Sequence, residues 1–302
     1  MQRATEQNLQ PEMPPQVNKP KQPVGLRWLT AAVAMPIVLA FTYLGGWWSF
    51  LGLAFVVFLS IYELYTMLFQ VGYRPIMPVT VGLCLLFMIA AMLPLQQHLL
   101  LLEIGLSASI LISLPWLFFR KNLDGAMLDW ALTLAVAVYV GWSMSSFLLL
   151  RGYASPWPFS SGPWWLLPRS IWWSLVVFLG VWGFDGAAFF AGRFFGRHKL
   201  APQVSPAKTW EGVAGGLILS IIAALVLTVK PLDVPWYLAI LLGILIGLAA
   251  VLGDLAESLL KRQTHVKDSG NFMPGHGGML DRIDSLIFAV IVVYLFTQLV
   301  GG

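Results

Sequence analysis

Long, nearly continuous apolar runs dominate the chain, and the polar residues gather between them. Each run approaches the roughly 20 residues that an α-helix needs to cross the hydrocarbon core of a bilayer. The runs lack the short apolar/polar alternation of transmembrane β-strands. The pattern therefore predicts an all-α, polytopic membrane helix bundle with about nine transmembrane helices. The expected spans are 27–44, 47–69, 76–94, 99–119, 127–150, 170–192, 210–229, 234–253 and 284–300.

The composition supports this class of protein. Hydrophobic residues make up 58% of the 302 residues and charged residues only 11%, whereas a soluble domain carries about 25% charged residues. The single cysteine, Cys84, excludes an intramolecular disulfide. Residues 1–26 are polar and rich in proline, which predicts a flexible cytosolic tail. They lack the apolar core and cleavage site of a signal peptide at the right place.

The distribution of basic residues predicts the orientation. Cytosolic loops of membrane proteins carry an excess of lysine and arginine. With nine spans and a cytosolic N-terminus, fifteen of the eighteen basic residues fall on the inner side, and only Arg151, Arg169 and Lys230 fall outside. The net charge of +4 then needs no nucleic-acid partner, because basic cytosolic loops lie beside anionic lipid.

Two polar loops, 193–209 and 254–284, fall on the cytosolic side of the C-terminal half. The second holds nine charged side chains in thirty-one residues, and charge beside hydrocarbon is costly unless it serves a function. We therefore expect a transmembrane scaffold of about five helices over 27–169 and a catalytic transmembrane region over 170–302.

The start of the second loop continues the eighth span as a helix. Asp254, Glu257, Ser258 and Lys261 then lie on one helical face, at positions i, i+3, i+4 and i+7. This face predicts a cluster of acidic and basic groups at the membrane surface.

The end of the same loop combines acids with glycines. Asp281 and Asp284 lie one helical turn apart at the start of the last span, and such carboxylates can share Mg²⁺, which prefers oxygen ligands. The glycines before them allow backbone N–H groups to approach phosphate oxygens. The alternative is an exposed loop whose acids cap a helix and pair with lysines.

Other polar residues carry weaker expectations. Asp185 lies inside the sixth span, where a carboxylate is functional by default. Glu63 is expected to be a structural hydrogen-bonding group. Ser205 or Thr209 would cap the seventh helix, with Pro206 in its first turn, and a helix N-terminus also attracts phosphate. A stripe of small residues predicts close helix packing within one chain or between two; it consists of Gly212, Gly215 and Gly216.

The last polar loop resembles a known family signature. The matching residues are Ser258-x-Leu260-Lys261-Arg262-x4-Lys267-Asp268-x-Gly270-x2-Met273-Pro274-x-His276-Gly277-Gly278-Met279-x-Asp281-Arg282-Ile283-Asp284. This run of 27 positions resembles the signature of the phosphatidate cytidylyltransferases (CDP-diacylglycerol synthases). The upstream segments around Asp185 and over 205–212 are also similar to this family, whereas the N-terminal half agrees only in being hydrophobic.

The resemblance implies transfer of the CMP moiety of CTP to phosphatidic acid with Mg²⁺, to which a second, monovalent cation could be added. It also implies a multi-pass protein of the inner (plasma) membrane whose site faces the cytoplasm, with homodimerisation as an open question. We expect Asp254, Asp281 and Asp284 to hold the metal. The expected catalytic residues are Asp281, Asp254, Lys261 and Lys208. The expected substrate-binding residues are Arg262, Lys267, Asp268, His276, Gly277, Gly278, Arg282, Ser205 and Asp185.

Two other functions stay open on the sequence. A CTP-dependent lipid kinase, acting on a polyprenol for example, would leave CDP and a phosphorylated lipid. A transporter would line an ion path with its acidic residues, but the two halves show no matching pair of broken spans, and the charges gather on one face.

Overall fold

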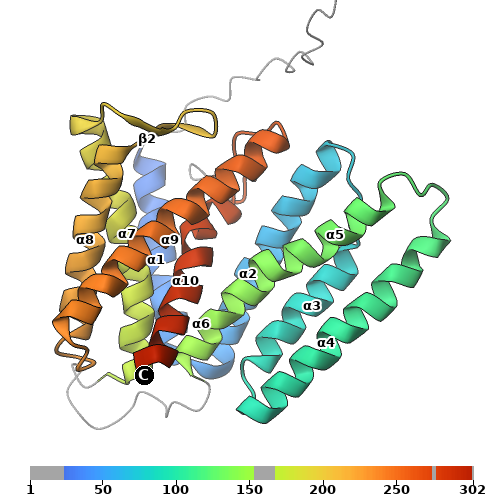
Figure 1. Cartoon of the computed structure of the whole chain (residues 1–302), viewed down its shortest axis with the longest axis horizontal. Helices are drawn as coiled ribbons and strands as arrows, with labels where there is room; N and C mark the ends of the chain where they lie inside the picture. Colours follow the sequence, from blue (N-terminus) through green and yellow to red (C-terminus); the bar gives the residue numbers. More distant parts are fainter. Residues whose placement is uncertain (1–23, 153–166, 274–276, 301–302) are drawn as a thin grey trace, which may run out of the picture.

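The structure, a computed structural model, describes residues 24–152, 167–273 and 277–300. These residues are almost entirely helical, as predicted, apart from one small two-stranded sheet (Figure 1). His276 and most of the N-terminal tail lie outside the described residues. The elements are α1 (Val24–Leu44), α2 (Gly46–Gln70), α3 (Met77–Ala90), α4 (Leu95–Trp116), the 3-10 helix η1 (Leu117–Phe119), α5 (Ala126–Val136), the π-helix η2 (Ala137–Trp142), α6 (Ser143–Arg151), α7 (Arg169–Phe195), β1 (Lys199–Ala201), β2 (Ser205–Thr209), α8 (Trp210–Thr228), α9 (Trp236–Gln263) and α10 (Leu280–Val300).

Seven helices of the described residues are long and apolar enough to cross a membrane. Two shorter apolar helical stretches, Ala32–Leu44 and Met77–Ala90, accompany them. Every predicted span overlaps one of these nine segments, because continuous apolar runs of this length satisfy their backbone hydrogen bonds within one helix. The prediction of helices at these positions is confirmed.

The helices form two neighbouring groups (Figure 1). Helices α7 to α10 lie together, with α1 beside them, and α2 to α6 form the other side of the bundle. The closest pairs are α7 with α8 and α9 with α10. A Cβ on Gly215 would lie 2.4 Å from Cβ of Ala191, and one on Gly216 would lie 2.6 Å from the Phe184 ring. The predicted glycine stripe therefore packs α8 against α7 within one chain.

The helix over 126–151 contains a π-helical turn that the sequence analysis did not predict. This turn, η2, lies against α3, where a Cβ on Gly141 would come within 2.4 Å of Sγ of Cys84. A π-helical turn changes the direction in which the following side chains point and is frequent at functional sites. Its Tyr139 packs edge-on against Phe288 of α10.

The expected loop between α7 and α8 contains a β-hairpin. Strands β1 and β2 pair antiparallel, with Ala201 opposite Ser205. The Thr209 hydroxyl accepts a hydrogen bond from the Gly212 amide at 3.2 Å, so the prediction of a Thr209 cap is confirmed. The placement of Pro206 in the first helical turn was wrong. Pro206 lies in β2, because the helix begins only after its cap residue.

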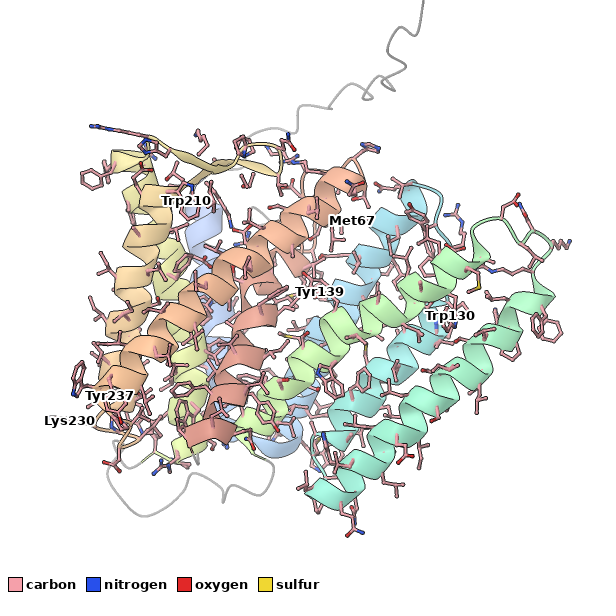
Figure 2. The ribbon with its side chains drawn as sticks, viewed as in Figure 1. Met67, Trp130, Tyr139, Trp210, Lys230 and Tyr237 are labelled. Carbon is pink, nitrogen blue, oxygen red and sulfur yellow. The ribbon has the colours of Figure 1, made fainter. Side chains whose placement is uncertain are left out.

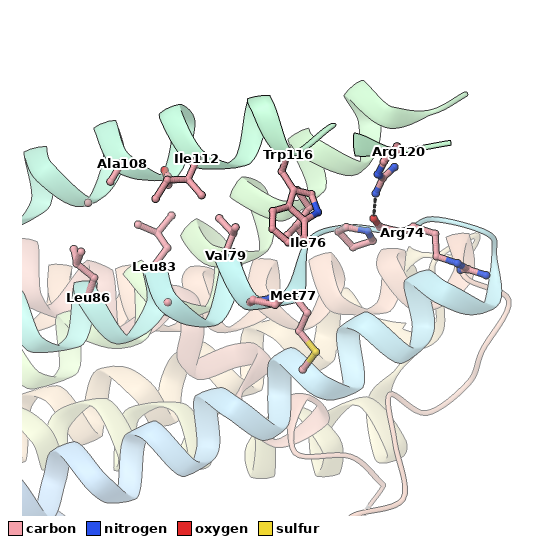
Figure 3. Close-up of a pocket in the computed structure, with 15 residues that line it drawn as sticks. Arg74, Ile76, Met77, Val79, Leu83, Leu86, Ala108, Ile112, Trp116 and Arg120 are labelled. Atoms are coloured by element: carbon pink, nitrogen blue, oxygen red, sulfur yellow. Dashed lines mark hydrogen bonds between the residues drawn. The ribbon is translucent and has the colours of Figure 1, made fainter. Parts of the chain in front are cut away.

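A groove of about 680 Å³ lies between α3 and α4 (Figure 3). Apolar side chains such as Leu83, Ile112 and Trp116 line it, and Arg74 and Arg120 lie at one end. Arg120 is paired with Asp129 at 2.6 Å. Among the described residues that line the groove, none is a predicted site residue and none carries a carboxylate. We therefore place the candidate site at the charged loops instead.

Candidate active site

The charged face predicted for the end of α9 is present and points toward α10. Lys261 forms an ion pair with Glu257 one turn earlier and with Asp281 of α10, where Nζ lies 2.7 Å from Oδ1. The Ser258 hydroxyl donates to Oδ1 of Asp254 at 3.2 Å. Glu257 is fully buried, and Lys261 and Asp281 keep 15% and 9% of their side chains exposed. One buried lysine thus holds two buried carboxylates.

Asp281 organises the loop before α10. Its Oδ2 accepts hydrogen bonds from the Gly278 amide at 2.8 Å and the Ser269 amide at 3.1 Å, while Lys261 occupies Oδ1. Both amides precede α10, so Asp281 orders the loop and does not cap the helix; of the alternative given for these acids, the pairing with a lysine is present. The Gly278 N–H, which we expected to face phosphate, donates to Asp281.

The hairpin contacts the end of α9 through two polar interactions. Nζ of Lys208 on β2 lies 2.5 Å from Oδ2 of Asp254, and Nε of Arg262 donates to the Val204 carbonyl at 3.2 Å. Just before β1, the Arg197 and His198 amides donate to the carboxylate of Glu211, in the first turn of α8, at 3.1–3.3 Å. Two segments about fifty residues apart in the chain thus form one polar surface, at the upper end of the bundle in Figure 1.

Three acids from three helices lie near enough to interact electrostatically. Asp185 of α7 and Asp284 of α10 each interact electrostatically with Asp254 of α9, and Lys208 and Arg282 also act on Asp185. Asp254 and Asp284 are half-buried, whereas Asp185 is exposed. Among the described residues, no three His, Cys, Asp or Glu side chains are placed to hold a metal ion between them. In this part of the chain the three expected ligands, Asp254, Asp281 and Asp284, therefore do not form one metal-binding group, and Asp281 is paired with Lys261.

The other predicted binding residues surround these groups. Arg262, Lys267, Asp268 and Arg282 are exposed, and in the described part of the chain none of them forms a salt bridge. The charges of Arg262, Lys267 and Arg282 can therefore meet an anionic ligand, whereas Asp268 is itself an anion. Ser205 is half-buried in β2. Gly277 has φ +85°, and a Cβ there would lie 2.8 Å from Oδ2 of Asp281, so this position requires glycine.

Sequence reasoning assigned no role in the site to two residues that the structure brings to it. Glu257 forms one of the two ion pairs of Lys261, whereas the sequence gives only its position on the charged face. Tyr139 has a buried hydroxyl without a hydrogen-bond partner among the described residues, and it interacts electrostatically with Glu257 and Asp284. An isolated tyrosine in an apolar span gave no signal, since its place depends on the unexpected π-helical turn.

Replacing Gly278 with alanine tests how tightly this loop is packed. A Cβ there would lie 2.0 Å from Oγ of Ser269 and 2.4 Å from Oε2 of Glu63. We expect the loop to shift and turnover to fall about 100-fold, the order expected for a displacement near 1 Å at a reacting centre. Gly82→Ala is the matched control, because its Cβ would meet nothing within 4 Å. Equal turnover in the two variants would contradict the packing described here.

A family model described as the cytidylyltransferase family matches residues 25–300. The chain belongs to the cytidylyltransferase family. A phosphatidate cytidylyltransferase from Synechocystis sp. is 30% identical over 298 residues, which cover 90% of this chain and 96% of that protein. The Haemophilus influenzae phosphatidate cytidylyltransferase is 48% identical over 123 residues, or 38% of this chain and 42% of the relative. The Bacillus subtilis one is 42% identical over 120 residues, or 39% and 45%.

For a cytidylyltransferase, the arrangement offers the required chemistry. Such a site must hold a nucleoside triphosphate, and this one presents exposed basic side chains beside half-buried carboxylates. The predicted family resemblance is confirmed, and the match covers the N-terminal helices as well as the signature loop.

Proposed function

We propose that this cytidylyltransferase transfers the CMP moiety of CTP to phosphatidate, giving CDP-diacylglycerol and pyrophosphate for phospholipid synthesis. The observation that carries the proposal is the joining of Lys208, Asp254, Lys261 and Asp281 into one charged site at the end of an apolar bundle. A water-soluble nucleotide can reach such a site from one side, and a lipid can reach it from the bilayer. The names of the relatives support the choice of phosphatidate as acceptor.

The reaction needs charge neutralisation more than a strong base. A phosphate monoester has a second pKa of about 6, so the attacking oxygen is already anionic at neutral pH. That oxygen forms a bond to the α-phosphorus of CTP while the bond from this phosphorus to the bridging oxygen of the β-phosphate breaks, and pyrophosphate leaves with the electron pair. The protein must bring two anions together, and fixed cations stabilise the charge that develops.

Each basic group has a position that suits this task. Arg262, Lys267 and Arg282 are exposed and suited to bind phosphates. Lys208 and Lys261 are held by carboxylates, so their ammonium groups are already oriented before substrate arrives. We predict that His276 donates a hydrogen bond to a substrate phosphate or orders the glycine loop. It lies outside the described residues, so its role stays a prediction.

The carboxylates fit a magnesium site completed by the nucleotide. Mg²⁺ is usually held by one or two carboxylates together with substrate phosphates and water. Asp254 and Asp284, with Asp185 nearby, provide oxygen donors in the same electrostatic neighbourhood. Bound there, the ion would neutralise charge on the triphosphate. Asp281 then serves the site by ordering Lys261 and the loop, and we propose it as a positioning group. Asp254 is paired with Lys208 and would have to release that ammonium group to bind the ion.

The proposed topology has nine membrane-spanning helices and a cytosolic N-terminus. The hairpin and the turn that follows α2 lie at the upper end of the bundle in Figure 1, and Lys230 lies at the opposite end in Figure 2. That turn contains Arg74. We propose an inner-membrane location with the site facing the cytoplasm; the excess of basic residues at the end that holds the hairpin supports this orientation. The N-terminal helices would support the site. A homodimer, if formed, would have to use a surface other than the glycine face of α8, which α7 covers.

Labelled nucleotides test the proposal. We expect label at the α-phosphate of CTP to enter phosphatidate, and label at the γ-phosphate to leave as pyrophosphate. Transfer of γ-label to a lipid would instead indicate a lipid kinase. As a control, Lys121→Ala on the exposed turn after η1 should keep near-normal turnover. Ion uptake into vesicles without nucleotide, in the absence of lipid labelling, would favour a transporter and contradict the proposal.

A further inference from the structure

Glu63 is a buried carboxylate in α2, more than two hundred residues before the loop that it contacts. Its side chain accepts hydrogen bonds from the Ser269 hydroxyl at 3.0 Å, the Met279 amide at 2.8 Å and the Leu280 amide at 2.9 Å. Only 5% of the residue is exposed. A buried carboxylate is costly unless donors compensate for its lost hydration. Here all three donors come from the segment that builds the charged site, which agrees with the prediction that Glu63 is a structural hydrogen-bonding group.

These contacts fix the start of α10. The first amides of a helix have no partner inside the helix, and the positive end of its dipole favours a carboxylate. Such a carboxylate usually comes from a residue next to the helix. In this chain Glu63 provides it from a different helix, so α2 determines where α10 begins. Asp281 and Asp284 occupy the first turn and a half of that helix.

The loop surrounds the carboxylate so closely that two glycines are required. A Cβ on Gly270 would lie 2.4 Å from Oε1 of Glu63, and one on Gly278 would lie 2.4 Å from Oε2. Ser269 connects Glu63 to the charged cluster, because its hydroxyl donates to Glu63 while its amide donates to Asp281. A continuous chain of hydrogen bonds and one ion pair thus leads from α2 to Lys261.

We propose that Glu63 is a positioning residue for CMP transfer, acting through Ser269 and the first turn of α10 to hold Asp281 and Asp284 against α9. The inference rests on the proposed function. It also changes the expected division of the chain, because the region 27–169 then contributes directly to the geometry of the site. Glu63 touches neither substrate in this account, so its removal should lower turnover more than nucleotide binding.

Glu63→Gln is the test variant. Glutamine keeps one acceptor oxygen but places an NH₂ group opposite a donor, so at least one of the three hydrogen bonds is lost. We expect kcat to fall roughly 10- to 100-fold, the scale of one lost hydrogen bond to a charged group, with little change in the KM for CTP. Hydrogen exchange at the Met279 and Leu280 amides should become faster.

Glu103→Gln is the matched control, because it makes the same chemical change on an exposed position of another membrane helix. The kcat and the amide exchange of this control should match those of the wild type. Unchanged kcat in folded Glu63→Gln protein would overturn the inference, whether or not amide exchange changes. An inactive wild-type protein would contradict the proposed function instead. If Glu63→Gln does not fold, Ser269→Ala carries the test, with a smaller fall in kcat expected and an unchanged kcat overturning the inference.

Discussion

Replacing Lys261 with methionine is expected to abolish CMP transfer and to destabilise the protein. The substitution leaves the carboxylates of Glu257 and Asp281 buried side by side without their shared cation. Removing one partner of a buried ion pair costs about 3–5 kcal/mol. Turnover should fall at least about 100-fold, the scale observed when one group that stabilises developing charge is removed. Lipid labelling and thermal unfolding in detergent measure the two effects.

A second substitution separates the two effects of Lys261. In the double variant Lys261→Met with Glu257→Gln, one of the stranded charges is removed, so stability should recover in part. Turnover should stay low, because the cation is still missing. Lys230→Met is the control, since Lys230 is exposed at the opposite end of the bundle (Figure 2). Near-normal CMP transfer by folded Lys261→Met protein would contradict the role proposed for Lys261.

Replacing Asp254 with asparagine is the second change for which we expect a large effect. Asp254 pairs with Lys208 at 2.5 Å and lies in the same electrostatic neighbourhood as Asp185 and Asp284. The variant removes one charge without changing the shape of the side chain. We expect turnover to fall about 100- to 1,000-fold and the Mg²⁺ concentration for half-maximal activity to rise. A magnesium titration of CMP transfer measures both quantities.

Asp233→Asn is the matched control for this charge removal. Asp233 is exposed in the turn before α9 and has φ +57°, a conformation that asparagine also tolerates. Its magnesium titration should coincide with that of the wild type. The proposed metal site would be contradicted if Asp254→Asn lowered turnover no more than Asp233→Asn does.

The sequence predicts the helices well because hydrocarbon imposes a simple rule. A long apolar run in hydrocarbon must form its backbone hydrogen bonds within itself, as a helix does. This rule places the helices around Ile246 or Val293 without any knowledge of packing. It also predicts the charged face of Asp254, Glu257, Ser258 and Lys261, because the 3.6-residue period alone brings these side chains together. Two of the resulting contacts, Lys261 with Glu257 and Ser258 with Asp254, are present.

The remaining features depend on contacts between distant segments. Nothing near Glu63 in the sequence shows that its partners lie at Met279 and Leu280. Asp281 could bind a metal or hold the loop amides, and the position of the Lys261 ammonium group decides between these roles. The spacing of the two residues in the sequence does not set that position. The π-helical turn that contains Tyr139 lies against α3, and apolar periodicity does not encode it.

The central claim is that this bundle joins CMP to phosphatidate at the Lys261 site. The most direct measurement supplies purified protein in detergent with phosphatidate, Mg²⁺ and CTP labelled at the α-phosphate, and compares wild type with Lys261→Met. We predict one pyrophosphate released for each labelled lipid formed by the wild type. EDTA should stop the reaction, and the variant should form almost no labelled lipid. Absence of labelled lipid from folded wild-type protein, or equal labelling by the variant, would contradict the account.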